Sequence, residues 1–193
     1  MSTRIIAITG GIGSGKSIIC NILHSLGYKI YDCDSNAKRL MDNNHTIKEL
    51  ISNNISPKAI DCNGNINRII LSEIVFNNSL KLKTLNSIVH DAIKTDIQEW
   101  IKINKDQNIL IIETAILYQS GLDKIVNEVW EVYTHLETRI SRVMFRNNMT
   151  REHVISRINS QKYSPVQKHH NTKTIINDDN KAIIPQIISL LNN

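Results

Sequence analysis

Cysteines, aromatic side chains and long apolar runs are scarce in this chain of 193 residues, and each scarcity excludes a class of protein. The three cysteines, Cys20, Cys33 and Cys62, are odd in number and form no CxxC pair, so we expect neither a disulfide framework nor a zinc site. A reducing cytoplasm is therefore the expected location. No apolar run approaches the ~20 residues of a membrane span. A strand-like run follows the opening Met-Ser-Thr-Arg directly, which leaves no room for a signal peptide.

The charge balance favours a small anionic ligand over a nucleic acid. The formal net charge is +5, which makes an anionic partner plausible. However, the basic residues are spread along the chain and aromatic residues make up only 5% of it, so a basic stripe or a stacking platform is not expected. The length suits one sizeable core with a small additional subdomain. We expect a monomer or a small homo-oligomer.

The most informative stretch runs from Ile5 to Ser17, where an apolar run ends in a glycine-rich turn. Gly10, Gly15, Lys16 and Ser17 fill the pattern G-x-x-x-x-G-K-[ST] of a phosphate-binding loop. In such a loop the backbone N–H groups form a concave nest for phosphate oxygens. The lysine reaches the β- and γ-phosphates, and the hydroxyl can bind magnesium. The alternative, a turn that carries Lys-Ser by chance, does not explain the strand before it and the helix after it. The stretch therefore predicts binding of a nucleoside triphosphate.

Hydrophobic periodicity predicts the rest of the fold. Short buried runs predict strands over 4–9, 28–31, 108–113, 128–134 and 174–176. Amphipathic spacing predicts helices over 16–26, 35–41, 136–148, 151–161 and 182–191. This alternation predicts an α/β fold of P-loop kinase type, with a doubly wound, parallel, five-stranded sheet. We expect a core of residues 1–42 and 108–193, a helical substrate region over about 43–107, and a helical lid over about 139–165.

Asp32 and Asp34 follow the second predicted strand, at the edge where such sheets bind ligands. If the segment is extended, alternation points both side chains the same way. One carboxylate could then accept a proton from a hydroxyl nucleophile while the other orients metal-bound water. We favour Asp34 as the base. The alternative is that one of the pair merely caps a helix beginning at Ser35.

Further candidates are a carboxylate at a strand end and several arginines. Glu113 closes an apolar strand, where kinases of this type keep an acid that holds magnesium through water; a solvated strand-end residue is the alternative. Arg139, Arg142 and Arg146 are spaced to share one helix face. Guanidinium groups suit the charge of a phosphoryl group in transfer, although a solvated basic face would have the same spacing. Arg157 and Gln161 stand at i and i+4 on the next helix and complete this set.

With these motifs in place, the chain resembles the dephospho-coenzyme A kinases over nearly its whole length. Residues 8–17 resemble the family's LTGGIGSGKS, and residues 32–39 are similar to its DADxxAR. Residues 85–90 resemble LNxxxHP, and residues 116–122 resemble PLLFExGL. Residues 142–161 are similar to the arginine-bearing lid, and residues 175–177 to the last strand, VIxN.

The resemblance implies ATP-dependent phosphorylation of the ribose 3′-hydroxyl of dephospho-coenzyme A, with magnesium. It implies catalytic roles for Lys16, Asp32, Asp34, Arg142 and Arg146. Substrate would be bound by Asp34, His90, Arg157 and Gln161, and metal by Ser17 and Glu113. Nucleotide would be bound by Gly11, Ile12, Gly13, Ser14, Gly15, Lys16, Ser17, Ile18, Arg142 and Asn177.

The chain departs from the family pattern at a few positions, and other functions compete with this interpretation. Ile18 stands where the family usually has Thr, Asp91 where it has Pro, and Gln119 where it has Glu. The nearest alternative is another P-loop small-molecule or nucleoside monophosphate kinase. A nucleotide-dependent switch or a nucleic-acid-binding ATPase is a more distant one, which the dispersed charge disfavours.

Overall fold

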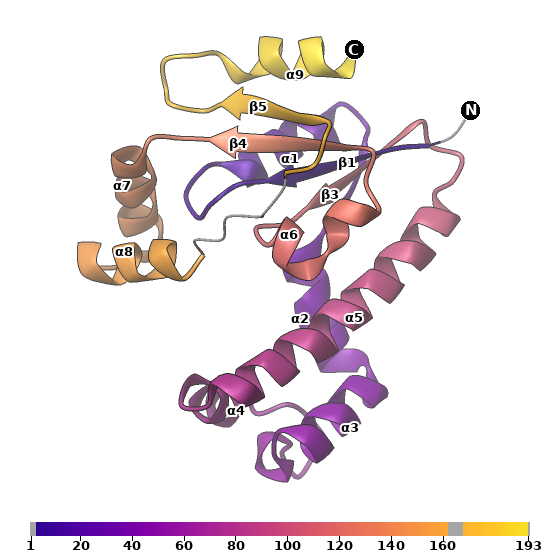
Figure 1. Ribbon diagram of the computed structural model, residues 1–193, viewed down its shortest axis with the longest axis vertical. Coiled ribbons are helices and arrows are strands. Elements are labelled where there is room, and N and C mark those ends of the chain that lie inside the picture. The colour runs from indigo at the N-terminus through magenta and orange to yellow at the C-terminus, as the bar shows by residue number, and fades with distance from the viewer. Residues whose placement is uncertain (1–2, 162–167, 193) are drawn as a thin grey trace. The chain divides into compact units, whose positions relative to one another are not determined.

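A five-stranded sheet in the order β2-β3-β1-β4-β5 organises the computed structural model, which describes residues 3–161 and 168–192 (Figure 1). Its strands are β1 (Arg4–Thr9), β2 (Lys29–Asp32), β3 (Ile109–Glu113), β4 (Glu128–Tyr133) and β5 (Thr172–Ile176). β1 pairs in parallel with β3 and β4, and β4 with β5. The predicted doubly wound α/β fold is confirmed. Among the described residues, no helix has the length and apolarity needed to cross a bilayer.

The central strand β1 is buried because it carries apolar residues without alternation. Ile6, Ala7 and Ile8 have no exposed surface. Helices α1 (Lys16–Ser25) and α9 (Ile183–Leu191) pack against this sheet and against each other. They bring the fully buried Ile19 and Ile187 into the same apolar cluster. An apolar run buried on both faces is typical of a parallel strand, so the local sequence was sufficient to predict β1.

The remaining helices follow the predicted order with some changed boundaries. They are α2 (Cys33–Asn43), α3 (His45–Asn54), α4 (Arg68–Phe76), α5 (Ser79–Ile103), α6 (Leu117–Ser120), α7 (Leu136–Asn147) and α8 (Arg151–Ser160), with 3-10 turns η1 (Pro57–Ala59) and η2 (Leu122–Lys124). Helix α2 begins two residues before the predicted Ser35, and β5 begins at Thr172 rather than Thr174. Helix α6 was not predicted. Residues 162–165 of the predicted lid lie outside the described residues.

The chain divides into two compact units. One consists of residues 1–31 and 104–193 and contains most of the sheet; the other is the helical stretch 32–103. The predicted helical region began near residue 43, whereas the helical unit begins at Asp32. The reason for the difference is that α2 packs against α3 and α5, and so belongs with the helices that follow it.

Asparagine side chains begin the helices of the second unit. Asn44, Asn67 and Asn78 accept hydrogen bonds from backbone N–H groups in the first turns of α3, α4 and α5. Asparagine is among the best residues at this position because its short side chain reaches those N–H groups. Helix α5 then buries Ile93 and Ile97 against its neighbours. The asparagine-rich turns of the sequence are therefore helix starts.

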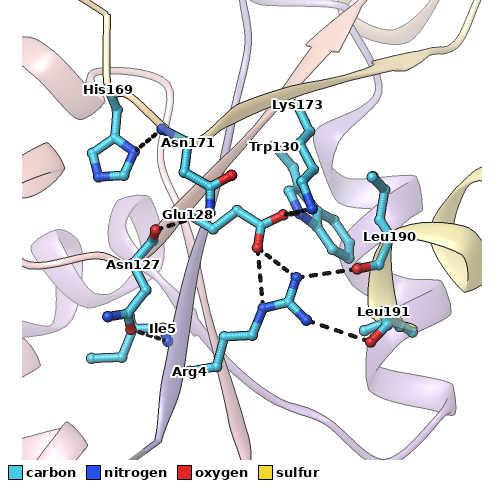
Figure 2. Close-up of polar contacts among 10 residues, drawn as sticks. All are labelled: Arg4, Ile5, Asn127, Glu128, Trp130, His169, Asn171, Lys173, Leu190 and Leu191. Carbon is cyan, nitrogen blue, oxygen red and sulfur yellow. Dashed lines mark hydrogen bonds and ion pairs between the residues drawn. The ribbon is translucent and has the colours of Figure 1, made fainter. Parts of the chain in front are cut away.

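A charged cluster joins the start of β1 to β4, β5 and the end of α9 (Figure 2). Its centre is Glu128, whose side chain is only 2% exposed. The Glu128 carboxylate accepts hydrogen bonds from Arg4 (2.5 and 3.1 Å) and from the Trp130 indole (2.7 Å), and it pairs with Lys173 at 3.1 Å. The guanidinium of Arg4 also donates to the Leu190 and Leu191 carbonyls at the end of α9. The cluster gives the buried Glu128 carboxylate its hydrogen-bond partners and attaches the end of α9 to the start of β1.

The environment of Glu128 favours its ionised form. Burial alone raises the pKa of the carboxyl, and it is the largest single influence. The hydrogen bonds from Arg4, Trp130 and Lys173, with the Arg4 charge, together outweigh it, so the pKa of Glu128 lies below its ordinary value. A carboxyl with a depressed pKa in the folded state stabilises the fold above its unfolded pKa. That stabilisation is lost as the pH falls through the folded pKa.

We expect Glu128→Gln to lower the free energy of unfolding by about 3 kcal/mol at neutral pH, because two cations lose their buried partner. Urea titration of wild type and variant measures the difference. The difference in the free energy of unfolding between wild type and variant should decrease as the pH is lowered through the depressed pKa of Glu128, because the wild-type carboxyl then becomes neutral as well.

Glu137→Gln is the matched control, because Glu137 of α7 pairs with Arg151 of α8 at the surface. It should lose far less stability than Glu128→Gln. Equal losses in the two variants would contradict a central role for the buried cluster.

Candidate functional site

The predicted phosphate-binding loop joins β1 to α1 in the conformation that the motif requires. Gly15, at φ +90°, precedes the first residue of α1, and no side chain caps that helix. The Ile18 N–H donates to the Gly15 carbonyl, and the positive end of the helix, which no side-chain acceptor neutralises, favours an anion. The Lys16 ammonium donates to the Gly10 carbonyl at 2.9 Å and so lies folded over the loop. Ser17 is exposed in the first turn of α1.

Gly13 allows the loop to lie directly against α7. Its φ is +78°, a conformation that disfavours side chains. A Cβ at this position would lie 2.7 Å from the Arg139 carbonyl oxygen and 2.9 Å from a Val143 methyl. The first of these is backbone and cannot turn aside. Glycine at this position is required by both the backbone angle and the packing of the lid helix.

Asn177, at the end of β5, fastens the loop from behind. Its Nδ2 donates to the Ser14 carbonyl at 2.8 Å, and its backbone N–H donates to the Tyr133 carbonyl. The Thr134 hydroxyl lies 2.9 Å from both the Ser14 and the Asn177 carbonyl oxygens and shares its proton between them. Asn177, Ser14 and Thr134 are buried, whereas Tyr133 is exposed. Asn177 was predicted to bind nucleotide, and in this structure it supports the loop that would do so.

The two lid helices hold the loop at Ile12. Arg139 of α7 donates from Nε to the Ile12 carbonyl at 2.9 Å, and Gln161, just after α8, accepts from the Ile12 N–H at 2.8 Å. The Ile12 side chain packs against the apolar cluster that joins α7 to α8, which includes Val143 and Ile158. Burial lowers the pKa of Arg139. Helix α7 and the end of α8 are therefore both attached to the loop through the backbone carbonyl and N–H of Ile12.

Two buried side-chain atoms in the described part of the chain have no hydrogen-bond partner, and both lie at this loop. They are Oγ of Ser14 and one terminal nitrogen, NH1, of Arg142. Both residues also contact the Asn177 side chain. Buried polar groups without partners are costly and rare, and they are expected where a ligand supplies the partner. The loop therefore fits a phosphate-bearing ligand.

The D-x-D pair was predicted to lie on an extended segment, but Asp34 lies inside helix α2. Asp32 is the N-cap of α2: its Oδ1 accepts from the backbone N–H groups of Asp34 (2.9 Å) and Ser35 (3.3 Å), and its Oδ2 accepts from the Ser35 hydroxyl at 2.5 Å. Asp34 lies in the first turn of the helix with an exposed side chain. Asp32 thus has the capping role that was the alternative interpretation. Placement of the pair beside the phosphate-binding loop stays a prediction.

The other predicted residues differ in how closely they approach the loop. Glu113 is half-buried at the end of β3, in register with Ile8 of β1. Arg142 donates to Asp179 at 2.6 Å and lies 3.5 Å from the Asn177 side-chain oxygen. Arg146 is exposed and donates to its neighbour Asn147, and Arg157 is also exposed. Within the described part of the chain, Arg139 contacts the loop and Arg142 contacts Asn177, which supports the loop, whereas Arg146 contacts Asn147.

His90 and Ile18, which were predicted to bind substrate and nucleotide, differ in their exposure to solvent. His90 is half-buried within α5 of the helical unit. Burial lowers its pKa, Lys94 lowers it further, and Asp91 opposes both, so the imidazole is neutral at neutral pH. Ile18 is 47% exposed on α1 and lies beside Ile184 and Ile188 of α9 in an apolar surface groove. The roles of His90 in substrate binding and of Ile18 in nucleotide binding stay predictions.

A cavity of about 350 Å³ borders the loop. Its walls come from the end of β1 and the loop, the segment after β3, the middle of β4, the end of α8 and the segment before β5: Thr9, Gly10, Gly11, Ala115, Leu117, Tyr118, Gln119, Glu131, Gln161 and Lys168. Glu131 and Lys168 form an ion pair at 2.6 Å in this wall, and the hydrogen bond from Glu131 raises the pKa of Lys168. The size is typical of a small-molecule site.

Two residues at the loop were not among the predicted candidates: Thr134 and Asp179. Arg139 was recognised only as part of an arginine face. Thr134 ends the fourth predicted strand, and its hydroxyl at the carboxyl edge of the sheet was a signal that could have been used. Asp179 gave no sequence signal, because its role depends on a contact with a residue 37 positions away.

Comparison with known proteins gives a consistent result across the chain. The family model for dephospho-CoA kinases matches residues 4–183. A dephospho-CoA kinase from Fusobacterium nucleatum is 37% identical over 161 residues, 83% of this chain and 82% of that protein. One from Bacteroides fragilis is 31% identical over 186 residues, which are 96% of this chain and 90% of that protein.

Solved structures agree with these sequence relatives. A crystal structure of a Thermus thermophilus protein matches with a TM-score of 0.79 at 28% identity and covers 100% of this chain and 96% of that one. A dephospho-CoA kinase from Campylobacter jejuni matches with a TM-score of 0.66 at 27% identity and covers 97% and 95% of the two chains.

We expect Gly13→Ala to abolish measurable ADP binding, because the new methyl group must push the loop away from the α7 backbone. Isothermal titration with ADP measures the effect. Gly27→Ala is the matched control: Gly27 also has a positive φ, of +92°, but its Cβ would meet nothing within 4 Å. It should pay only the backbone strain, about 1 kcal/mol, and bind ADP like wild type. Retained ADP binding in Gly13→Ala would contradict the importance of this close approach.

Proposed function

The chain belongs to the dephospho-CoA kinase family, and from this premise we propose that it transfers the γ-phosphoryl group of ATP to the ribose 3′-hydroxyl of dephospho-coenzyme A. The match to the family along almost the whole chain carries the proposal, because it includes the acceptor-binding region as well as the loop. The two unpaired buried atoms at the loop support binding of the nucleotide phosphates. A nucleoside monophosphate as acceptor is not favoured.

In the proposed reaction the chain binds and orients the two substrates. N–H groups of the loop and of the first turn of α1 would hold the ATP phosphates, with Lys16 at the β- and γ-phosphates. Ser14 and Arg142 would supply the donors that have no partner in the structure. Magnesium bound through Ser17 and Glu113 would neutralise charge between the β- and γ-phosphates.

The transfer itself forms one bond and breaks one. The 3′-oxygen bonds to the γ-phosphorus, the bond from that phosphorus to the bridging oxygen breaks, and ADP leaves. The proton of the hydroxyl passes to the Asp34 carboxylate, which is exposed and has no capping duty. Asp32 would hold Asp34 in place through the cap of α2. As a second role, Asp32 would orient metal-bound water. Arg142 and Arg146 would stabilise charge on the transferred group. His90, Arg157 and Gln161 would contact the acceptor.

Incubation with magnesium, ATP and a panel of acceptors tests the function. Dephospho-coenzyme A should be converted to coenzyme A, with one ADP formed for each product molecule. Nucleoside monophosphates should give little product under the same conditions. Preferential phosphorylation of a nucleoside monophosphate would replace the proposed acceptor, and absence of transfer to any acceptor would overturn the proposal.

Asp34→Asn should lower turnover by about 10²–10⁴-fold while both substrates still bind, because the amide cannot accept the proton. Steady-state kinetics and separate binding titrations measure the two effects. Asp42→Asn is the control, since Asp42 lies on the same helix in an exposed pair with Arg68; its turnover should match wild type. Turnover of Asp34→Asn within a few-fold of wild type would remove Asp34 as the base.

The same assay separates the two roles of Asp32. Asparagine caps a helix about as well as aspartate. If Asp32 acts only as a cap, Asp32→Asn should retain both turnover and the response to magnesium. If it also orients metal-bound water, the variant should need more magnesium at saturating substrates.

A further inference from the structure

Asp179 occupies an unusual backbone position just beyond β5. Its φ is +66°, in the left-handed region that few residues other than glycine adopt. Aspartate and asparagine tolerate this region better than most residues, because a short polar side chain can bond locally. The consequence in this chain is that a carboxylate is placed two residues after Asn177, the residue that fastens the phosphate-binding loop.

The carboxylate of Asp179 is directed at Arg142 on α7. Its Oδ1 lies 2.6 Å from the terminal nitrogen NH2 of Arg142, while the Asn177 side-chain oxygen lies 3.5 Å from the same nitrogen. The Asp179 side chain is 70% exposed and the Arg142 side chain 26%. One end of the guanidinium is thus held by an acid at the surface.

The other end of the same guanidinium is the one that has no partner. NH1 of Arg142 is buried and makes no hydrogen bond within the described part of the chain. Because the guanidinium is a rigid planar fork, fixing NH2 also fixes the direction in which NH1 points. The pairing therefore orients the free nitrogen.

We propose that Asp179 is a positioning residue for nucleotide binding, which holds the Arg142 guanidinium so that NH1 is presented to the phosphates. The proposal rests on the proposed function in that it takes Arg142 as a nucleotide-binding residue. Without Asp179 the long arginine side chain has to be ordered when the nucleotide binds. Ordering one such side chain weakens binding by about two- to twelvefold.

A double-mutant cycle between Asp179 and Arg142 tests the proposal. Asp179→Gly removes the carboxylate and suits the positive φ, whereas Asp179→Asn keeps an acceptor without the charge. Each is made in wild type and in Arg142→Ala, with Arg142→Lys as a second background in case the alanine variant does not fold. Binding of ADP without magnesium and kcat/KM for ATP are measured for every variant.

We expect Asp179→Gly to weaken ADP binding and to lower kcat/KM for ATP by about two- to twelvefold, and Asp179→Asn to lie between it and wild type. In the Arg142→Ala background the change at Asp179 should have no further effect. A purely structural role would give the same loss in both backgrounds. Asp178→Asn is the control for altered charge, since Asp178 faces His135 at 4.0 Å, and it should bind ADP like wild type.

Unchanged or tighter ADP binding in Asp179→Gly would overturn the proposal, as would an equal loss in the two backgrounds. Because ADP binding needs no acceptor, this result is separate from the test of the proposed reaction. If the wild type binds ADP but does not phosphorylate dephospho-coenzyme A, the proposed function fails, and the cycle in ADP binding still decides the role of Asp179.

Discussion

The carbonyl of Ser14 is the point on which the geometry of the phosphate-binding loop depends. A loop that turns its N–H groups inward must turn carbonyls outward, and an outward carbonyl in a protein interior needs donors. Asn177 and Thr134 supply them from the ends of β5 and β4. The curl of the loop is thereby fastened to the carboxyl edge of the sheet. A loop fixed before the ligand arrives loses little freedom on binding, which is the physical advantage of building it on a buried strand.

Elements with a strong local signal could be predicted from the sequence. The unbroken apolar run of β1 and the glycine-rich turn after it are sufficient to specify a buried strand and a phosphate-binding loop. The start of α2 was misplaced because the carboxylate of Asp32 can serve either a strand end or a helix cap, and only the cap satisfies the N–H groups of Asp34 and Ser35. The helical unit begins at Asp32 because α2 packs on α5, a contact between segments far apart in the sequence that no local pattern indicates.

The site shows the same distinction. Motif residues of the loop were identified because their spacing along the chain carries the chemistry. Arg139 and Gln161 both bind the backbone of Ile12, whereas the sequence gave Arg139 as a candidate for phosphoryl charge and Gln161 as a candidate for substrate binding. Asp179 has no motif at all, since its effect depends on a backbone angle and on an arginine 37 residues away. Candidate ligand-binding residues could be proposed from the sequence, whereas several residues that support or orient them required the three-dimensional structure.

The division of the chain has a consequence for its synthesis on the ribosome. The helical unit, residues 32–103, is continuous, so its internal contacts join residues that are all made before residue 104. The sheet unit differs, because both neighbours of β1 are strands encoded after that stretch. The isoleucines of β1 must therefore stay unpaired while about one hundred residues are added, and Arg4 meets the end of α9 only when the last helix is made. The central strand of the sheet is thus translated before the other four strands. Both of its neighbouring strands are made only after residues 32–103.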